Sequence, residues 1–188
     1  MSEDSLGDRR KALEEEFFAK QNQRLLKHFQ ETTAAKAKTE ALAAASGIAD
    51  ADVLAQLADI NLSSETVAAL SLIPLLEVAW ADGRIEAKER SALLAAAEQE
   101  GISKDSASYQ LLEEWSKERP SPQVLAAWKA YVAALSNTLD AQAKQALKQD
   151  LLGRARAVAE ASGGFLGLGK RISNAEQAVL TDLEQAFS

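Results

Sequence analysis

Acidic side chains gather around a glycine turn in the stretch Val78-Ala79-Trp80-Ala81-Asp82-Gly83-Arg84-Ile85-Glu86-Ala87-Lys88-Glu89. The second half of this stretch matches the second half of an EF-hand calcium loop, in which acids follow a central glycine at fixed positions. Val78 and Trp80 stand where the first half needs ligand oxygens, which excludes a complete EF-hand. Calcium and magnesium nevertheless prefer carboxylate oxygens. Asp82, Glu86 and Glu89 are therefore candidate metal ligands.

A later stretch repeats the pattern. Val158-Ala159-Glu160-Ala161-Ser162-Gly163 is followed, after an insert from Gly164 to Arg171, by Ile172-Ser173-Asn174-Ala175-Glu176. In both copies Val-Ala-x-Ala leads to a glycine, and then to an isoleucine with a glutamate four residues further on. We interpret the chain as an internally duplicated helix-turn-helix whose two turns face each other. Glu176 would then join the candidate site, where a cation would relieve the repulsion between the pooled carboxylates.

Helix capping is the competing interpretation of the same glutamates. Ser173-x-x-Glu176 fits a capping box, in which the glutamate binds the backbone at the start of its helix, and Glu86-x-x-Glu89 is a weaker version. A glutamate in this position is more often structural than a metal ligand. The residues alone leave both roles open.

Two other features carry little chemistry. Gly164 to Lys170 fits the G-x-x-x-x-G-K half of a phosphate-binding loop, but Arg171 replaces the required serine or threonine and no strand precedes it. Its apolar residues either pack on the bundle or touch a partner. His28 is the only histidine and has no nucleophile or orienting group in a recognisable arrangement. We therefore expect no enzyme and no nucleotide site.

The elements that must position these residues are all helical. Hydrophobic residues make up 47% of the 188 residues, but aromatic residues only 5%, and there are just 3 prolines and 9 glycines to break helices. This composition predicts an all-α helical bundle with duplicated units and a long N-terminal helix. We divide it into a charged helix and linker over 1–46, a short connecting helix over 47–62, and a helical domain over 63–188.

Local signals set several helix ends. Gly47 is expected to stop a helix, and Asp50 to begin the next one. Pro74 predicts either a kink or a helix that restarts near Leu72. A helix is expected from Ser103 to Lys117, and the next starts with Ser121 as its N-cap and Pro122 at its first position. Three tryptophans fall among the apolar helical positions and are expected in the core: Trp80, Trp115 and Trp128.

The N-terminal helix is expected over Gly7 to Gln30, with a broad apolar stripe formed by Leu13, Phe17, Phe18, Leu25, Leu26 and Phe29. From Glu3 to Glu31 its polar residues are nearly balanced, with seven acids (Glu3, Asp4, Asp8, Glu14, Glu15, Glu16, Glu31) and six bases (Arg9, Arg10, Lys11, Lys20, Arg24, Lys27). The stripe docks either on its own domain or on another chain, as a protein partner or by self-association through residues 7–30. The alanine- and lysine-rich segment Thr32 to Ser46 continues this helix or forms a helical linker.

Bulk properties narrow the classes of partner. The net charge of −7 argues against a generic nucleic-acid surface. Every long apolar run is broken by a charge well short of a membrane span, so no membrane insertion is expected. The absence of cysteine excludes disulfides and thiolate metal sites. No apolar stretch typical of a secretory signal follows Met1, and we expect a soluble cytoplasmic protein.

The stretch from Leu75 to Glu89 resembles the signature of TerB-like domains, the tellurite-resistance family. The resemblance extends over roughly Ser64 to Ser188. It implies an all-helical domain with two similar halves whose acidic residues around the turn take part in divalent-metal binding. Asp82, Gly83 and Glu89 match the motif, as does Glu176, whereas Ser162 replaces the acid of the second turn.

The expected function is a non-enzymatic TerB-like module that binds a divalent cation, calcium or magnesium, in a stress-response or regulatory complex. The first alternative is a metal-free protein-interaction or oligomerisation module that uses the N-terminal helix. A hydrolase with carboxylates as acid and base is disfavoured, because the sequence offers no nucleophile and no catalytic histidine.

Overall fold

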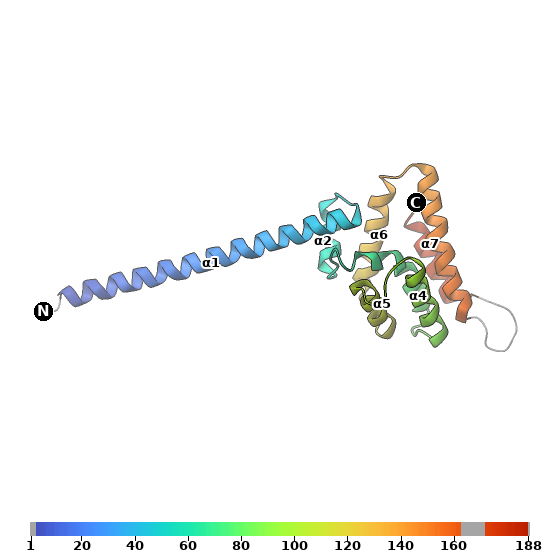
Figure 1. The fold of residues 1–188 in the computed structure, drawn as a ribbon, viewed down its shortest axis with the longest axis horizontal. Helices are drawn as coiled ribbons and strands as arrows, with labels where there is room; N and C mark the ends of the chain where they lie inside the picture. Colours follow the sequence, from blue (N-terminus) through green and yellow to red (C-terminus); the bar gives the residue numbers. More distant parts are fainter. Residues whose placement is uncertain (1–2, 163–171, 188) are drawn as a thin grey trace. The chain divides into compact units, whose positions relative to one another are not determined.

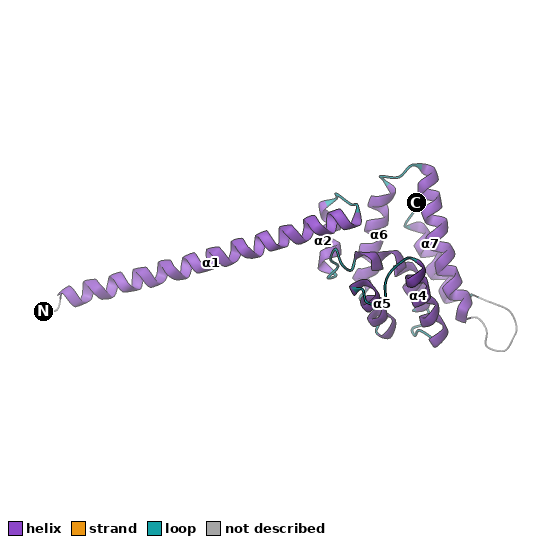
Figure 2. Cartoon of the chain, viewed as in Figure 1, coloured by secondary structure: helices purple, strands orange, loops and turns teal. Residues whose placement is uncertain are grey.

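The computed structural model describes residues 3–162 and 172–187, with side chains from Lys20 onward apart from Asn22 and Ser162. This part of the chain forms helices and no strands (Figures 1 and 2). The elements are α1 (Glu3–Ser46), α2 (Ala51–Asp59), the 3₁₀-helix η1 (Val67–Leu72), α3 (Ile73–Ala79), α4 (Ala87–Gln99), α5 (Ala107–Lys117), α6 (Pro122–Ser136), α7 (Ala141–Ser162) and α8 (Asn174–Gln185). The predicted all-α class is confirmed. The phosphate-loop-like insert lies outside the described residues.

The chain divides into two compact units, Met1–Glu40 and Ala41–Ser188. α1 is one continuous helix, so Thr32 to Ser46 continues the first helix, which was one of the two predicted alternatives. Exposed ion pairs one turn apart, Lys27–Glu31 and Lys36–Glu40, lie along it. Its last residues belong to the second unit, where Leu42 is buried in the core. The second unit therefore includes the segment 47–62, which the sequence assigned to a separate connector.

The entry into the second unit follows local signals. Gly47 takes a positive φ of 71° after the last turn of α1, a conformation that glycine adopts without steric cost. The Asp50 carboxylate accepts hydrogen bonds from the backbone N–H groups of Asp52 and Val53 and so caps α2. α2 then buries Val53, Leu54 and Leu57. Both predicted helix boundaries are confirmed.

α3 is the centre of the second unit. Pro74 lies in its first turn, where the missing N–H group leaves no hydrogen bond unmade, and η1 ends just before it. Of the two predictions for Pro74, the restart near Leu72 is therefore the one the structure contains. All seven residues of α3 are buried, and the helix contacts η1, α4, α6, α7 and α8. The core around it includes Trp128, whose ring meets Phe187 edge to face.

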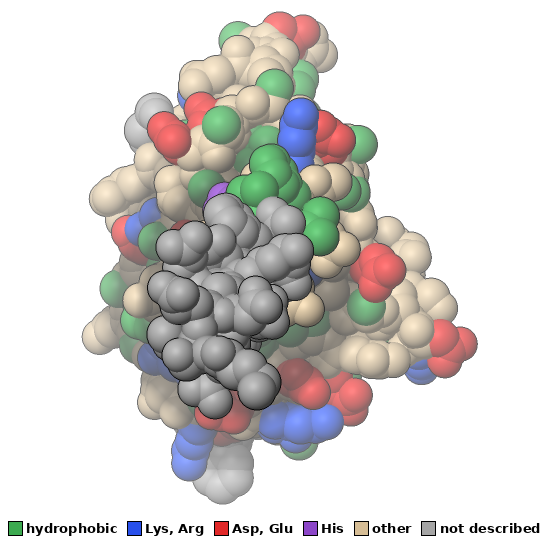
Figure 3. Space-filling model, turned by 90° about the vertical axis from the view of Figure 1, so that its left-hand side faces the viewer, with side chains coloured by type: hydrophobic (Ala, Val, Ile, Leu, Met, Phe, Trp, Pro, Cys, Tyr) green, Lys and Arg blue, Asp and Glu red, His purple; other side chains and the backbone are tan. Residues whose placement is uncertain are grey.

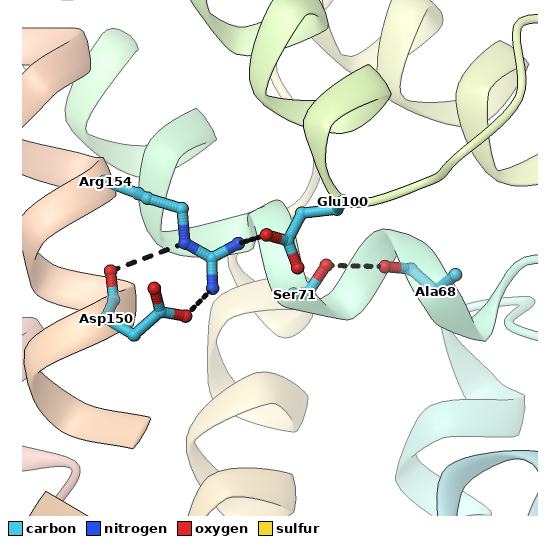
Figure 4. A network of polar contacts seen from close by, with 5 residues as sticks. All are labelled: Ala68, Ser71, Glu100, Asp150 and Arg154. Carbon is cyan, nitrogen blue, oxygen red and sulfur yellow. Dashed lines mark hydrogen bonds and ion pairs between the residues drawn. The ribbon is translucent and has the colours of Figure 1, made fainter. Parts of the chain in front are cut away.

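Two helix pairs, α3–α4 and α7–α8, pack on each other: α7 contacts both α3 and α4, and α8 contacts both α3 and α7. Lys148 in the first part of α7 pairs with Glu184 at the end of α8 at 2.8 Å, so these two helices run in opposite directions. Glu100, just after α4, pairs with Arg154 in the middle of α7. Figure 4 shows that α4 also runs opposite to α7 there.

α5 starts later than expected but ends at Lys117, as predicted. The Ser106 hydroxyl accepts a hydrogen bond from the Tyr109 N–H group and caps the helix, so the predicted start at Ser103 was too early. At the other end two backbone carbonyls receive side chains from distant elements. The Trp80 indole N–H donates to Trp115 O at 2.9 Å, and the Arg90 guanidinium donates to Ser116 O at 3.1 Å. These bonds satisfy carbonyls that a helix end leaves without intrahelical partners.

Within the described ranges, no single helix is both long and apolar enough to cross a membrane. One bent pair, Gln23–Ser46 with Ala51–Asp59, passes by length and composition alone, with 105° between its two parts.

Two glycines, Gly83 and Gly153, allow a matched test of where the backbone requires a positive φ. An added Cβ would meet no atom within 4 Å at either Gly83 or Gly153. Gly83 has a φ of 90°, which L-residues adopt at a cost, whereas Gly153 lies inside α7. We expect Gly83→Ala to lower the free energy of unfolding by about 1–2 kcal/mol, and Gly153→Ala to raise it by up to about 1 kcal/mol. Urea denaturation measures both, and a stabilised Gly83→Ala variant would contradict the assigned turn.

Candidate functional site

The first predicted turn, between α3 and α4, carries three of the four candidate ligands. Asp82 is exposed, and its carboxylate accepts a hydrogen bond from the Arg84 N–H group at 3.3 Å. Glu86 is also exposed and lies 3.8 Å from the Arg84 guanidinium. Glu89 is only 3% exposed, and its Oε2 accepts a hydrogen bond from the Glu86 N–H group at 2.7 Å. Glu86 and Glu89 thus form the capping box predicted for the start of α4.

The second predicted turn, before α8, is built the same way. The Glu176 Oε2 accepts from the Ser173 N–H group at 2.6 Å, and the Ser173 hydroxyl accepts from the Glu176 N–H group at 3.2 Å. Glu176 is 6% exposed. The predicted capping box is confirmed, and both capping glutamates are almost fully buried. The negative charge of each carboxylate is also stabilised by the positive end of the dipole of its own helix.

The directions of the helices show at which end of the bundle the two turns lie. Because α4 and α8 both run opposite to α7, their first residues lie toward the end of the bundle at which α7 ends. The described side chains nevertheless contain no group of three or more acidic or histidine residues arranged to hold a metal ion. Glu89 and Glu176 are engaged in capping, and Asp82 and Glu86 face solvent. The cation site stays a prediction.

A buried charge that the sequence analysis did not single out lies in α3. Glu77 is 7% exposed, and the nearest guanidinium nitrogen of Arg119 is 3.6 Å from its Oε2. Burial raises the pKa of Glu77, and the positive charge of Arg119 opposes that rise only in part. Nearby, Lys129 pairs with Asp182 at 2.7 Å. The available signal was that Glu77 is the one charge inside the apolar run from Val67 to Ala81.

The second notable surface is on α1. Leu25, Leu26 and Phe29 are the large hydrophobic residues that stand exposed among the described side chains, at 53%, 61% and 58%. We call these three residues the α1 patch. They lie within about one turn of the helix, among charged residues of the sequence. On the face of the molecule drawn in Figure 3, green hydrophobic side chains stand next to blue and red ones. Contiguous exposed apolar residues commonly mark interaction sites.

Comparison of the chain with protein-family models, with curated proteins and with solved structures finds no match. The likeness to TerB-like domains therefore rests on the residues quoted from the sequence.

The buried Glu77 predicts a specific pH dependence. Because its folded-state pKa is raised, the folded chain binds more protons than the unfolded chain between pH 4.5 and that pKa. Stability from this group is therefore lost as pH rises through the window, by about 1.4 kcal/mol for each pH unit that separates the folded and unfolded pKa values. Glu77→Gln should remove the loss, while the exposed Glu118→Gln should keep it. Urea denaturation at a series of pH values measures the difference between variants. Parallel curves for the parent and Glu77→Gln would contradict the assignment.

Proposed function

We propose that this chain is a non-enzymatic protein-interaction module that self-associates through α1. The observation that carries the proposal is the α1 patch, where Leu25, Leu26 and Phe29 expose more than half of their surface. Every other leucine, isoleucine, valine and aromatic side chain that the structure describes is buried or half-buried. The patch therefore differs in kind from the rest of the described surface.

A long helix also gains from a partner. Isolated helices are held by weak intrahelical pairs, and most helical stability in proteins comes from packing of an apolar face. The ion pairs seen along α1, at 3.8 and 3.9 Å between exposed side chains, contribute little. Packing the α1 patch against another helix would stabilise α1 more than these ion pairs do.

Charge favours a second copy as the partner. Residues 3–31 carry seven acids and six bases, a net charge of −1, so the remainder of the chain carries −7 − (−1) = −6. Two copies of the remainder repel each other, whereas two copies of the nearly neutral helix meet both signs of charge. Two chains that associate through α1 therefore meet less electrostatic repulsion than two chains that associate through the remainder.

The expected affinity is modest. Burying the exposed half of a leucine or phenylalanine contributes on the order of 1 kcal/mol, and three such residues on two chains give about 6 kcal/mol. Association costs about 4–15 kcal/mol in lost freedom. Further contacts along α1 must therefore contribute, and the oligomer should depend on concentration.

Replacing the patch tests this directly. The Leu25→Ser, Phe29→Ser variant should remain monomeric at concentrations where the mass of the parent, measured by light scattering, rises toward that of a dimer. A control variant, Ala34→Ser, Ala37→Ser, changes exposed positions on the same helix without removing large apolar surface and should behave as the parent does. A parent that is monomeric throughout, or a patch variant that still dimerises, would refute the proposal.

A divalent-cation site at the two turns is the second candidate, as the TerB-like resemblance implies. The observation in its favour is that Glu89 and Glu176 are both nearly buried, at 3% and 6% exposed, at the starts of helices that begin toward the same end of the bundle. A cation there would add its attraction to carboxylates that the fold already holds in place.

Glutamine variants separate capping from cation binding, because glutamine also serves in a capping box. Glu89→Gln should leave the cation-free melting temperature nearly unchanged. If the site binds calcium or magnesium, millimolar cation should raise the melting temperature of the parent. That rise should be smaller in Glu89→Gln and in Asp82→Asn, and unchanged in the control Glu98→Gln. Trp80 fluorescence gives an independent reading of the first turn. A parent that does not respond to either cation would exclude this candidate.

A further inference from the structure

A cavity of about 410 Å³ opens in the second unit, between the last turn of α1, η1, the end of α4, α6 and α7. Its volume falls within the range of about 300–1,000 Å³ typical of small-molecule sites. Neither the sequence motifs nor the proposed self-association involves it. All of its lining residues belong to the unit Ala41–Ser188.

The inner wall of the cavity is apolar. It is formed mainly by six side chains that are buried or partly buried: Leu70, Ile102, Trp128, Val132, Leu147 and Leu151. Tyr131 adds a second aromatic ring, and its hydroxyl donates a hydrogen bond to the Ser46 carbonyl at 3.4 Å. A ligand that fits this wall must have an apolar body.

The outer part of the cavity carries a charged cluster (Figure 4). Arg154 lies between two carboxylates: its guanidinium contacts Glu100 Oε1 at 2.5 Å and also pairs with Asp150. All three residues line the cavity. Ser71, also in the lining, donates its hydroxyl hydrogen bond to Ala68 O at 2.9 Å. Two acids and one base leave this cluster with a net charge of −1.

The charge and geometry of the cluster select the ligand head group. Arg154 contacts one oxygen of each carboxylate, and a carboxylate accepts several hydrogen bonds, so each retains acceptor capacity. Glu100 and Asp150 are both exposed and therefore reachable from solvent. An anion would meet two carboxylates, while the one cation present is already paired. A cation is attracted by the net charge of the cluster.

We propose that this cavity binds a small amphipathic amine, with the apolar body against Trp128, Val132 and Leu151 and the ammonium group at Glu100 and Asp150. Binding is a simple association with no covalent step. It uses residues that the α1 patch does not contain, so it holds or fails independently of self-association.

Three probes with the same chain length but different head groups test the charge selection on the full chain. n-Octylamine is protonated at pH 7, as a lysine side chain is; n-octanol is neutral and n-octanoate is negative. Each is titrated below its micelle concentration, and binding is followed by backbone amide chemical shifts of the lining residues and by tryptophan fluorescence. We expect the affinity for octylamine to be at least about fivefold higher than that for octanol, and octanoate to bind most weakly.

Variants then assign the binding to the cavity. Glu100→Gln and Asp150→Asn should each weaken octylamine binding by about fivefold and leave octanol binding unchanged. Glu98→Gln is the matched control, because Glu98 pairs with Lys104 at 3.1 Å near the same helix end but does not line the cavity. Ala68→Phe, at an exposed lining position, should weaken all probes by filling space. Equal affinity for the three probes, no binding at millimolar concentration, or an equal loss in Glu98→Gln would overturn the proposal.

Discussion

The complete burial of α3 is the constraint on which the second unit depends. A helix of seven residues is too short to be stable alone, so its conformation rests on the elements that surround it. Five neighbouring elements pack against it, and their relative positions follow from covering one short apolar rod on every side. Glu77 is the exception inside that rod, because its carboxylate is buried with only a partial counter-charge from Arg119. A buried carboxylate of this kind opposes folding when ionised, so the apolar packing around it must more than offset that effect.

The acidic residues of the two turns have a structural role at the starts of their helices. The first backbone N–H groups of α4 and α8, like those of any helix, have no intrahelical acceptors and need others. Glu89 and Glu176 meet that need in both places, with nearly identical bonds of 2.7 and 2.6 Å. A pair of similar turns is therefore sufficient to account for the similar sequences around them. A cation would have to bind carboxylates that already have this structural task.

Short-range signals in the sequence predicted short-range structure well. Gly47, Asp50, Pro74 and the Ser173 capping box each act through residues at most four positions away, and each appears where expected. The boundary of the second unit at Ala41 was not predicted, because a single buried leucine, Leu42, anchors an otherwise alanine- and lysine-rich helix end. Contacts between distant positions, such as Glu100 with Arg154 or Glu77 with Arg119, have no periodic signature. The cavity and the pairing of the buried Glu77 with Arg119 therefore emerged only from the three-dimensional arrangement.

The end of α5 has a consequence for the order in which the chain acquires structure. Its last turn has no glycine cap, and the carbonyls of Trp115 and Ser116 are satisfied by side chains 35 and 26 residues earlier. Without the Trp80 and Arg90 side chains, these carbonyls would depend on water, and the last turn of α5 would be free to fray. The last turn of α5 is thus held by tertiary docking in addition to its own sequence, which predicts the same end at Lys117. Slow exchange of the amide hydrogens in that turn would report that α3 and α4 have reached their places.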